Sequence, residues 1–256
     1  MMRSLIIVIL SISFQLPNIA QATYYGDPAR AMKQGGISVG IGLSELTRKV
    51  KQDVTLNSDL LGTFTSSDTA EVNYSDRLVQ LGYGATDQIE LLGRMGTTIF
   101  EYDSSPNETG STVGFGFRYL SKRGDDAVAN EVSVGVIGLY NYTSYTSRYE
   151  ELGLMQTDIL FGVSNTISRD TRLFGAGLFS SLEGRAVATD EIKREVEIAV
   201  GLPEGDISNF IIDITQDQQI GGIIGVEYSM EETVNVGAEI HLMFESGFAF
   251  FFNLEF

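Results

Sequence analysis

Apolar residues recur at every second position along ten stretches of this chain, and this alternation constrains its fold more than any other feature. In the first stretch, GGISVGIGLSEL, alternate residues from Ile37 to Leu43 are aliphatic, and those between them are glycine or serine. Successive side chains of a β-strand point to opposite faces, so the pattern predicts strands with two unlike faces. The ten stretches are residues 35–46, 77–83, 89–97, 112–120, 131–142, 155–163, 171–182, 220–228, 234–244 and 247–256.

The second face of these strands is small and polar, with only scattered charges. A soluble sandwich would coat its outer face with charged residues, whereas small residues with a few opposite charges suit the confined interior of a narrow barrel. The apolar face then meets lipid, where a free strand edge is not tolerated and the sheet has to close. The charges expected on the inner face are Glu90, Arg94, Arg118, Asp158, Glu227, Glu239 and Glu255.

The last ten residues, GFAFFFNLEF, form an amphipathic strand that runs to the final residue. Most domains finish in a polar, loosely held tail. We expect the apolar side of this strand to face lipid, and the strand itself to close the barrel against the stretch at 35–46. Its lipid-facing residues are Phe248, Phe250, Phe252, Leu254 and Phe256.

The connections between the stretches are mostly long and short in turn. The links at 46–70 and 184–218 are long, whereas GATDQ, NTISRD and SMEET are tight. Outer-membrane barrels have long loops outside and short turns on the periplasmic side. The chain therefore predicts an all-β fold: a closed antiparallel transmembrane β-barrel of about ten strands, with eight as the alternative.

The link at 184–218 has two readings. TDEIKREVEIAV has apolar residues at helical spacing, with Thr189 as its cap. NFIIDITQ instead predicts a strand that continues beyond the membrane. A loop of this length either enters the lumen as a plug or stands outside as a binding surface, and we favour the external position.

The first 22 residues have the layout of a secretory signal peptide. Arg3 precedes the apolar run LIIVIL, and AQA at residues 20–22 supplies the small-x-small cleavage pattern. The apolar run is too short for a membrane anchor. We expect a signal peptide at 1–22, a short periplasmic segment at 23–34 and one barrel domain at 35–256.

Composition excludes several classes of function. The chain has no cysteine, which leaves no disulfide framework and no thiol chemistry. Its net charge of −17 argues against a nucleic-acid partner, because such proteins carry basic patches. His241 is the single histidine, so too few ligands are present for a metal site, and we expect no cofactor.

The signal peptide, the strand-turn-strand stretch LGYGATDQIELLGRMG and the terminal FAFFFNLEF resemble the small bacterial outer-membrane β-barrels of the OmpA-like and OmpW-like general type. The resemblance covers nearly all of residues 35–256 and concerns architecture, since one barrel serves many tasks. It implies a place in the bacterial outer membrane, surrounded by lipid and lipopolysaccharide. It also implies that the barrel-assembly machinery reads the terminal strand, and it leaves the oligomeric state open.

Three functions remain open. The first is a small passive channel or a structural membrane protein with a narrow, ion-paired lumen. The second is surface adhesion or binding through loops 46–70 and 184–218. The third is a barrel protease or lipid-modifying enzyme centred on His241 and Glu239. Against the third, His241 fills lumen space and hydrogen-bonds Glu239, and we expect no enzyme. The residues expected to form the lumen charge network are Glu90, Arg94, Arg118, Asp158, Glu239 and His241.

Side-chain directions can be predicted as well. Leu242 should face lipid and Met243 the lumen, whereas the facing of 171–182 stays open. We expect Arg94 and Arg118 to pair with Glu90, Asp158 or Glu239 across the lumen, which would leave conductance small or absent. Aromatic residues near strand ends should meet the lipid headgroups. These residues are Tyr83, Tyr119, Tyr140, Tyr142 and Tyr228.

Overall fold

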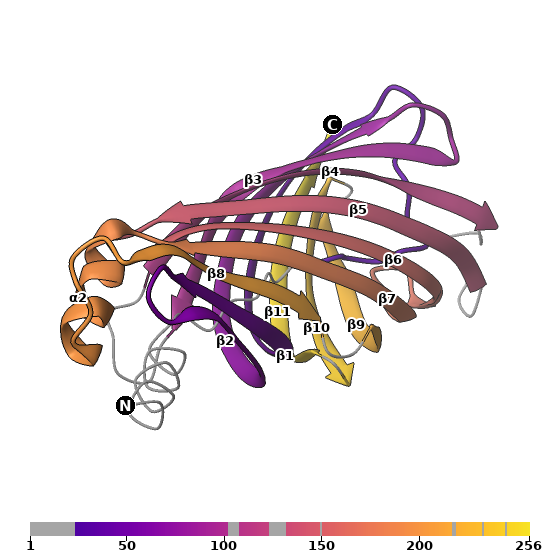
Figure 1. The fold of residues 1–256 in the computed structure, drawn as a ribbon. Helices are drawn as coiled ribbons and strands as arrows, with labels where there is room; N and C mark the ends of the chain where they lie inside the picture. Colours follow the sequence, from indigo (N-terminus) through magenta and orange to yellow (C-terminus); the bar gives the residue numbers. More distant parts are fainter. Residues whose placement is uncertain are drawn as a thin grey trace.

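The computed structural model describes residues 24–101, 108–122, 132–148, 150–216, 219–231, 233–243 and 245–256, so the expected signal peptide lies outside the described residues. Within this part of the chain there are eleven β-strands and one helix, α2 (Asp190–Val200) (Figure 1). None of the described residues forms a helix long and apolar enough to cross a membrane. The strands are β1 (Ile37–Ser58), β2 (Gly62–Gly84), β3 (Ile89–Glu101), β4 (Glu108–Lys122), β5 (Val132–Thr146), β6 (Glu150–Ser168), β7 (Thr171–Ala188), β8 (Ile207–Gln216), β9 (Ile220–Glu231), β10 (Val234–Met243) and β11 (Glu245–Glu255).

Ten of the described strands close a ring of antiparallel pairs. Each strand from β1 to β7 pairs with the next, β7 pairs with β9, and β10 and β11 follow. The ring closes where β11 pairs with β1, from Ser38↔Glu255 to Arg48↔Glu245. At one end of the barrel, which we call the C-terminal rim, Ile37 and Phe256 exchange backbone hydrogen bonds of 3.1 and 2.8 Å. The predicted closed barrel is therefore confirmed, with ten strands in the ring and not eight.

The side chains of the barrel sort between its two faces largely as predicted. On β1, alternate residues from Ile37 to Leu43 point outward, and Ile41 is 52% exposed, while the residues between them are buried. Large apolar side chains on the outside of a closed sheet are the arrangement of a membrane-spanning barrel, because lipid covers them. On the terminal strand the exposed side chains are Phe248, Phe250, Phe252 and Phe256, and Leu254 is half-buried.

The side-chain directions on β7 and at Met243 were established only by the structure. On β7, Phe174 and Leu178 point inward while Leu173 and Phe179 point outward, because this strand carries apolar side chains on both faces. Met243 does not face the lumen as predicted: it is 71% exposed. It ends β10 with a φ of 83°, and the left-handed backbone there interrupts the alternation on which the prediction depended.

Four strands are much longer than a membrane crossing requires. About 9–11 tilted residues are enough for a crossing, and β10 and β11 have 10 and 11. By contrast β1 and β2 have 22 and 23, and β6 and β7 have 19 and 18. The expected loop at 46–70 is instead the far half of the β1–β2 hairpin, paired up to Ser58↔Gly62. The loop expectation was wrong because strand alternation continues through this stretch with polar and apolar positions exchanged.

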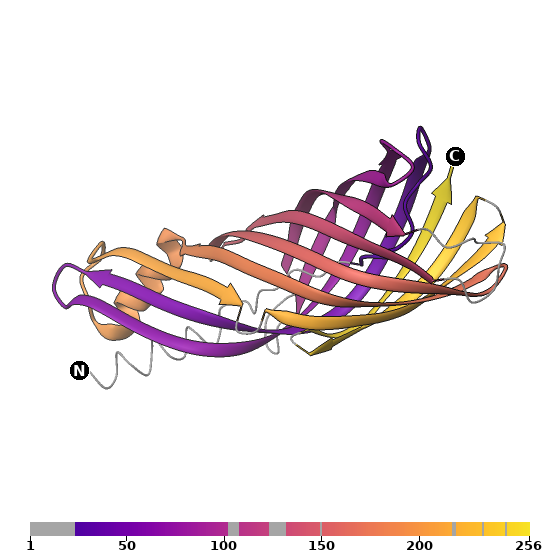
Figure 2. The same cartoon turned by 90° about the vertical axis from the view of Figure 1, so that its right-hand side faces the viewer.

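The far ends of the four long strands, together with β8 and α2, form a second part of the molecule. We call this part the extension (residues 46–74, 150–154 and 182–216). β8 lies between β1 and β7 beyond the ends of β9, β10 and β11, pairing from Val50↔Gln216 and from Glu183↔Thr215. Figures 1 and 2 show α2 and the β1–β2 hairpin at the opposite end from the C terminus. Both readings of 184–218 are thus confirmed, as a helix after Thr189 and a strand at 207–216, standing outside the barrel ring.

Candidate functional site

The interior of the barrel is occupied by the chain's own residues 24–34, which we call the lumen segment. Tyr25 is 0% exposed, and Tyr24, Asp27 and Ala29 are also buried. Residues 23–34 were expected in the periplasm; the structure instead places Tyr24 to Met32 inside the ring, and Lys33 and Gln34 are exposed. The reason is chemical complementarity, because polar side chains of the wall bind both its backbone and its charged side chains.

Two wall residues each make a pair of hydrogen bonds with the backbone of the lumen segment. The carboxylate of Glu239, on β10, accepts hydrogen bonds from the amides of Tyr25 (2.9 Å) and Gly26 (3.1 Å). The guanidinium of Arg118, on β4, donates to the carbonyl oxygens of Arg30 (2.9 Å) and Tyr25 (3.3 Å). Hydrogen bonds to charged groups are the stronger kind, so the segment is fixed at several points along its length.

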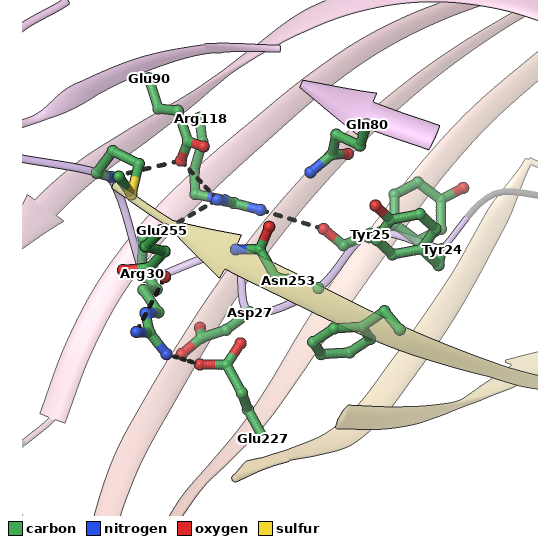
Figure 3. A pocket seen from close by; sticks show the side chains of 13 residues that line it. Tyr24, Tyr25, Asp27, Arg30, Gln80, Glu90, Arg118, Glu227, Asn253 and Glu255 are labelled. Carbon is green, nitrogen blue, oxygen red and sulfur yellow. Dashed lines mark hydrogen bonds and ion pairs between the residues drawn. The ribbon is translucent and has the colours of Figure 1, made fainter. Parts of the chain in front are cut away.

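Glu90 links this arrangement to the wall. Its carboxylate lies 2.6 Å from Arg118 Nη1, accepts a bond from Ser38 Oγ at 3.3 Å, and faces the amide of Met32 at 3.4 Å. Figure 3 shows Arg118 between Glu90 and the lumen segment. The predicted pairing of Arg118 with Glu90 is therefore present, and the same guanidinium also serves the segment.

The segment's own charges complete the contacts. Arg30 hydrogen-bonds Glu227 and lies 3.0 Å from Glu255, and Asp27 lies 3.7 Å from Arg172 (Figure 3 shows Arg30 and Glu227). A buried charge without a partner is strongly destabilising. Wall and segment therefore depend on each other for charge compensation.

Inward glycines shape the wall around the segment. A Cβ on Gly42 would lie 1.8 Å from the ring of Tyr24. A Cβ on Gly135 would lie 2.1 Å from the carbonyl oxygen of Pro28, and one on Gly162 would lie 2.2 Å from its Cγ. At these glycines the lumen segment approaches the wall more closely than a larger side chain would allow.

His241 lies deeper in the barrel and is enclosed by carboxylates. Its Nδ1 is 2.9 Å from Glu245 and its Nε2 is 3.1 Å from Glu239, and the side chain is 1% exposed. Glu245 also contacts Arg48 and accepts a bond from the Tyr74 hydroxyl at 3.3 Å. Both ring nitrogens are occupied, so neither faces a space that a substrate could enter. Among the described residues, no group of three or more His, Cys, Asp or Glu is arranged to hold a metal ion.

Two members of the predicted charge network have neutral partners. Arg94 donates to Gln80 at 2.7 Å and lies 5.2 Å from the ring centre of Tyr24, which is a cation–π contact. Asp158 accepts from the Gln156 amide at 2.8 and 2.9 Å. Within the described part of the chain, Arg94 reaches no carboxylate at ion-pair distance, so its predicted pairing is wrong.

Sequence reasoning missed several site residues. Asp27 and Arg30 belong to a segment without strand alternation, and Arg172 lies on the strand whose facing stayed open. Arg48 lies in a stretch assigned to a loop. The alternation of β1 could have located Arg48, because every second residue from Ser38 onward points inward and Arg48 belongs to this series.

Beyond His241 the interior changes from polar to apolar. An apolar cluster spans the inside of the extension and joins β1, β2, β5, β6, β7, β8 and α2. Such packing leaves no room for a water path through these side chains. The cluster consists of Leu46, Val50, Val54, Leu56, Val72, Tyr74, Tyr145, Leu152, Leu154, Leu182, Ala186, Ala188, Val196, Ile207, Phe210, Ile212 and Ile214.

Free volume beside the lumen segment lies mainly toward the C-terminal rim, where a pocket of about 270 Å³ borders Arg30, Met32 and Phe256. The pocket in Figure 3, between the segment and the wall, has a volume of about 30 Å³. One water molecule needs about 10–15 Å³ of such volume. The pocket therefore has room for a few water molecules and not for a continuous aqueous channel.

Comparison with known proteins finds only distant structural likeness. No protein-family model matches the chain, and no curated protein matches it. The similar solved structures include the outer membrane protease OmpT from Escherichia coli (12% identity, 86% of this chain and 96% of that chain, TM-score 0.47). They also include the outer membrane protein OprG from Pseudomonas aeruginosa (10%, 86% and 97%, 0.38) and Ail, the attachment invasion locus protein of Yersinia pestis (9%, 87% and 99%, 0.30).

The closed ring and its apolar exterior define a transmembrane β-barrel of the outer-membrane type. At these identities the likeness to solved structures carries no activity over to this chain.

Proposed function

We propose that the protein is a closed barrel that anchors a folded platform at the cell surface, and that it is not an open passage. The observation that supports this is the filled interior, with the lumen segment in one part and the apolar cluster in the other. Water-filled porins are built from 16–18 strands, whereas barrels of about eight strands are filled by side chains. The ten-stranded ring lies near the filled end of this range.

The platform is the extension, whose outer face suits contact with water and with partners. Lys51, Asp53 and Thr55 alternate on β1 with buried residues. Asp53 accepts bonds from Ser67 Oγ at 2.5 Å and from Lys51 Nζ at 3.0 Å, so polar side chains of the two strands are linked. An ordered polar surface of this kind favours binding through 46–70 and 184–218 over conduction.

The proposal includes how the chain reaches its place. Residues 1–22 serve as the signal peptide, and the barrel-assembly machinery reads the terminal strand that ends at Phe256. Outer-membrane lipid and lipopolysaccharide surround the apolar exterior. No enzymatic role is included, because the only histidine is buried between Glu239 and Glu245.

The proposal is tested by recording currents from the full chain in planar lipid bilayers. We expect no stable conductance steps, and large, stable, porin-like steps would contradict the closed barrel. Orientation is tested separately by cysteine labelling, for which the cysteine-free chain gives no background. In intact cells a membrane-impermeant maleimide should label Thr55→Cys in the extension. Gln88→Cys, in the turn near the C-terminal rim, should react only after the outer membrane is opened; the reverse pattern would refute the surface platform.

A further inference from the structure

We infer that the barrel lumen is a peptide-binding site, that the chain's own lumen segment fills it, and that this segment is a releasable ligand and not a fixed part of the wall. The ligand class is an extended polypeptide with two neighbouring aromatic residues, then an acidic residue and an arginine. This goes beyond the proposed function, since a closed surface platform needs no exchangeable segment.

The wall binds the segment in the way that proteins bind extended peptides. Main-chain hydrogen bonds give affinity in such sites, and pockets for individual side chains give specificity. Here Glu239 and Arg118 bind main-chain amides and carbonyl oxygens of the segment. Because these contacts do not depend on side-chain identity, they suit any extended chain threaded at this position.

Specificity comes from the aromatic pair and the charges. The ring of Tyr25 stacks on His241 with 5.6 Å between ring centres, and Tyr24 stacks on Phe251 at 5.8 Å. Arg30 then places its guanidinium against Glu227. Recognition elements are thus spread along the segment from its aromatic end to its arginine.

The barrel wall does not use the segment to close. All ten pairings of the ring form between strands. Among the described residues, the backbone bonds between this part of the chain and the strands are at the rim, between Gly35, Gly36 and Gly84, at 2.8 and 2.9 Å. The segment is therefore tethered at one end, and its other contacts can be exchanged for water without opening the sheet.

An emptied lumen would favour a cationic replacement. Glu227 and Glu255 would lose Arg30, and Glu239 would lose two amide donors. Buried carboxylates without partners are costly. The site therefore favours a peptide that carries a positive charge where Arg30 now lies.

The test uses the full chain with one cysteine at Ala29→Cys, inside the segment, and measures its reaction rate with a charged thiol reagent in lipid vesicles. Arg30→Ala should raise this rate at least about tenfold, because it removes the ion pairs with Glu227 and Glu255 that only the bound segment makes. Arg185→Ala is the matched control, since it breaks the exposed pair with Asp213 (2.8 Å) on the extension and should leave the rate unchanged. Asp27→Asn, which weakens the contact with Arg172, replaces Arg30→Ala if that variant does not fold.

A second cysteine position separates release from general loosening. Leu154→Cys, in the apolar cluster, should stay unreactive in every variant. No rise at Ala29→Cys, or a parallel rise at both positions, would overturn the inference of a releasable segment.

A synthetic peptide tests the lumen as a binding site. Added to the full chain that carries only Ala29→Cys, the peptide YYGDPARAMKQ (residues 24–34) should speed the labelling of the cysteine, because it competes with the tethered segment for the lumen. A scrambled peptide of the same composition should not. No rise with the first peptide, or an equal rise with both, would overturn the inference of a peptide-binding lumen.

Discussion

The membrane section of the barrel and the extension share the four long strands β1, β2, β6 and β7, and the apolar face of these strands is outward in the first part and inward in the second. Along β1 the inward and outward directions alternate without interruption from Ile37 to Ser58. In the first half the outward residues are apolar, as at Ile41. In the second half most inward residues are apolar, as at Val54, and Arg48 and Gln52 are the buried polar exceptions. The surroundings of the strand, and not its register, decide which face is apolar, and the exchange between Leu43 and Leu46 marks the boundary between lipid and water.

This difference explains how each interior is filled. The apolar inside of the extension closes by packing its own side chains. The inside of the membrane section is mixed: an apolar cluster that includes Tyr24 and Tyr25 fills part of it, and its buried charges need partners. The lumen segment supplies those partners, which is why one region needs a second piece of chain and the other does not.

The largest effect should come from a cavity inside the extension. Phe210→Ala removes a fully buried ring from the apolar cluster and should cost about 3–5 kcal/mol of stability. Ser44→Ala, at an inward position of the membrane section, should cost about 1 kcal/mol or less. Urea unfolding in lipid vesicles measures both, and equal costs would mean that the two interiors do not differ as described.

On the outward face, a substitution in the membrane section should cost more stability than one in the extension. Ile41→Arg puts a charge on the lipid side and should cost about 2–4 kcal/mol near the bilayer midplane. Thr55→Arg, at an outward position of the same strand, should change stability by less than about 0.5 kcal/mol. The same unfolding assay applies, and a larger loss for Thr55→Arg would place the membrane boundary elsewhere.

Glycine substitutions sharpen the comparison within the membrane section. Gly135→Ala would push a methyl group into Pro28 of the lumen segment and should cost about 1–3 kcal/mol. Gly93→Ala meets nothing within 4 Å and should be neutral or slightly stabilising. Heat-induced unfolding monitored by gel mobility distinguishes the two, and identical midpoints would argue against contact between Gly135 and the segment.

The smallest effect concerns pH on the outer face of the extension. The hydrogen bond from Ser67, with a second from Lys51, holds the pKa of the Asp53 carboxyl below its ordinary value. Because the folded-state pKa is the lower one, this contribution to stability is present above the unfolded pKa and is lost as pH falls through the folded one. NMR titration should show the lowered pKa, and Ser67→Ala should raise it toward the ordinary value. An unchanged pKa in Ser67→Ala would contradict this cause.

The strands of the ring could be predicted because apolar and polar residues alternate within the sequence of each strand. The terminal aromatic residues from Phe248 onward and the inward charges Glu90 and Glu239 could be placed in this way. Alternation also continues through 46–70, but there the apolar residues occupy the inward positions. The stretch was therefore predicted as a loop. At Met243 the left-handed backbone broke the period that the prediction assumed.

The lumen segment could not be predicted, for a different reason. Its stretch YYGDPAR has no strand or helix period, and the bond from Tyr25 to Glu239 joins residues 214 positions apart. Contacts at that separation depend on the closed ring, which brings β10 beside the start of the chain. Arg94 shows the same limit, since its position was predicted and its partner Gln80 was not.

Inward and outward residues alternate along the whole of β1, while the medium outside the strand changes from lipid to water and the interior stays filled. Spin labels placed singly along β1, from Ile37 to Asn57, test it by their collisions with oxygen and with a water-soluble nickel complex. Outward positions up to Leu43 should favour oxygen, outward positions from Thr47 should favour nickel, and inward positions should be protected from both. Nickel access at the inward positions Ser38 to Ser44, or no switch between Leu43 and Thr47, would contradict the account.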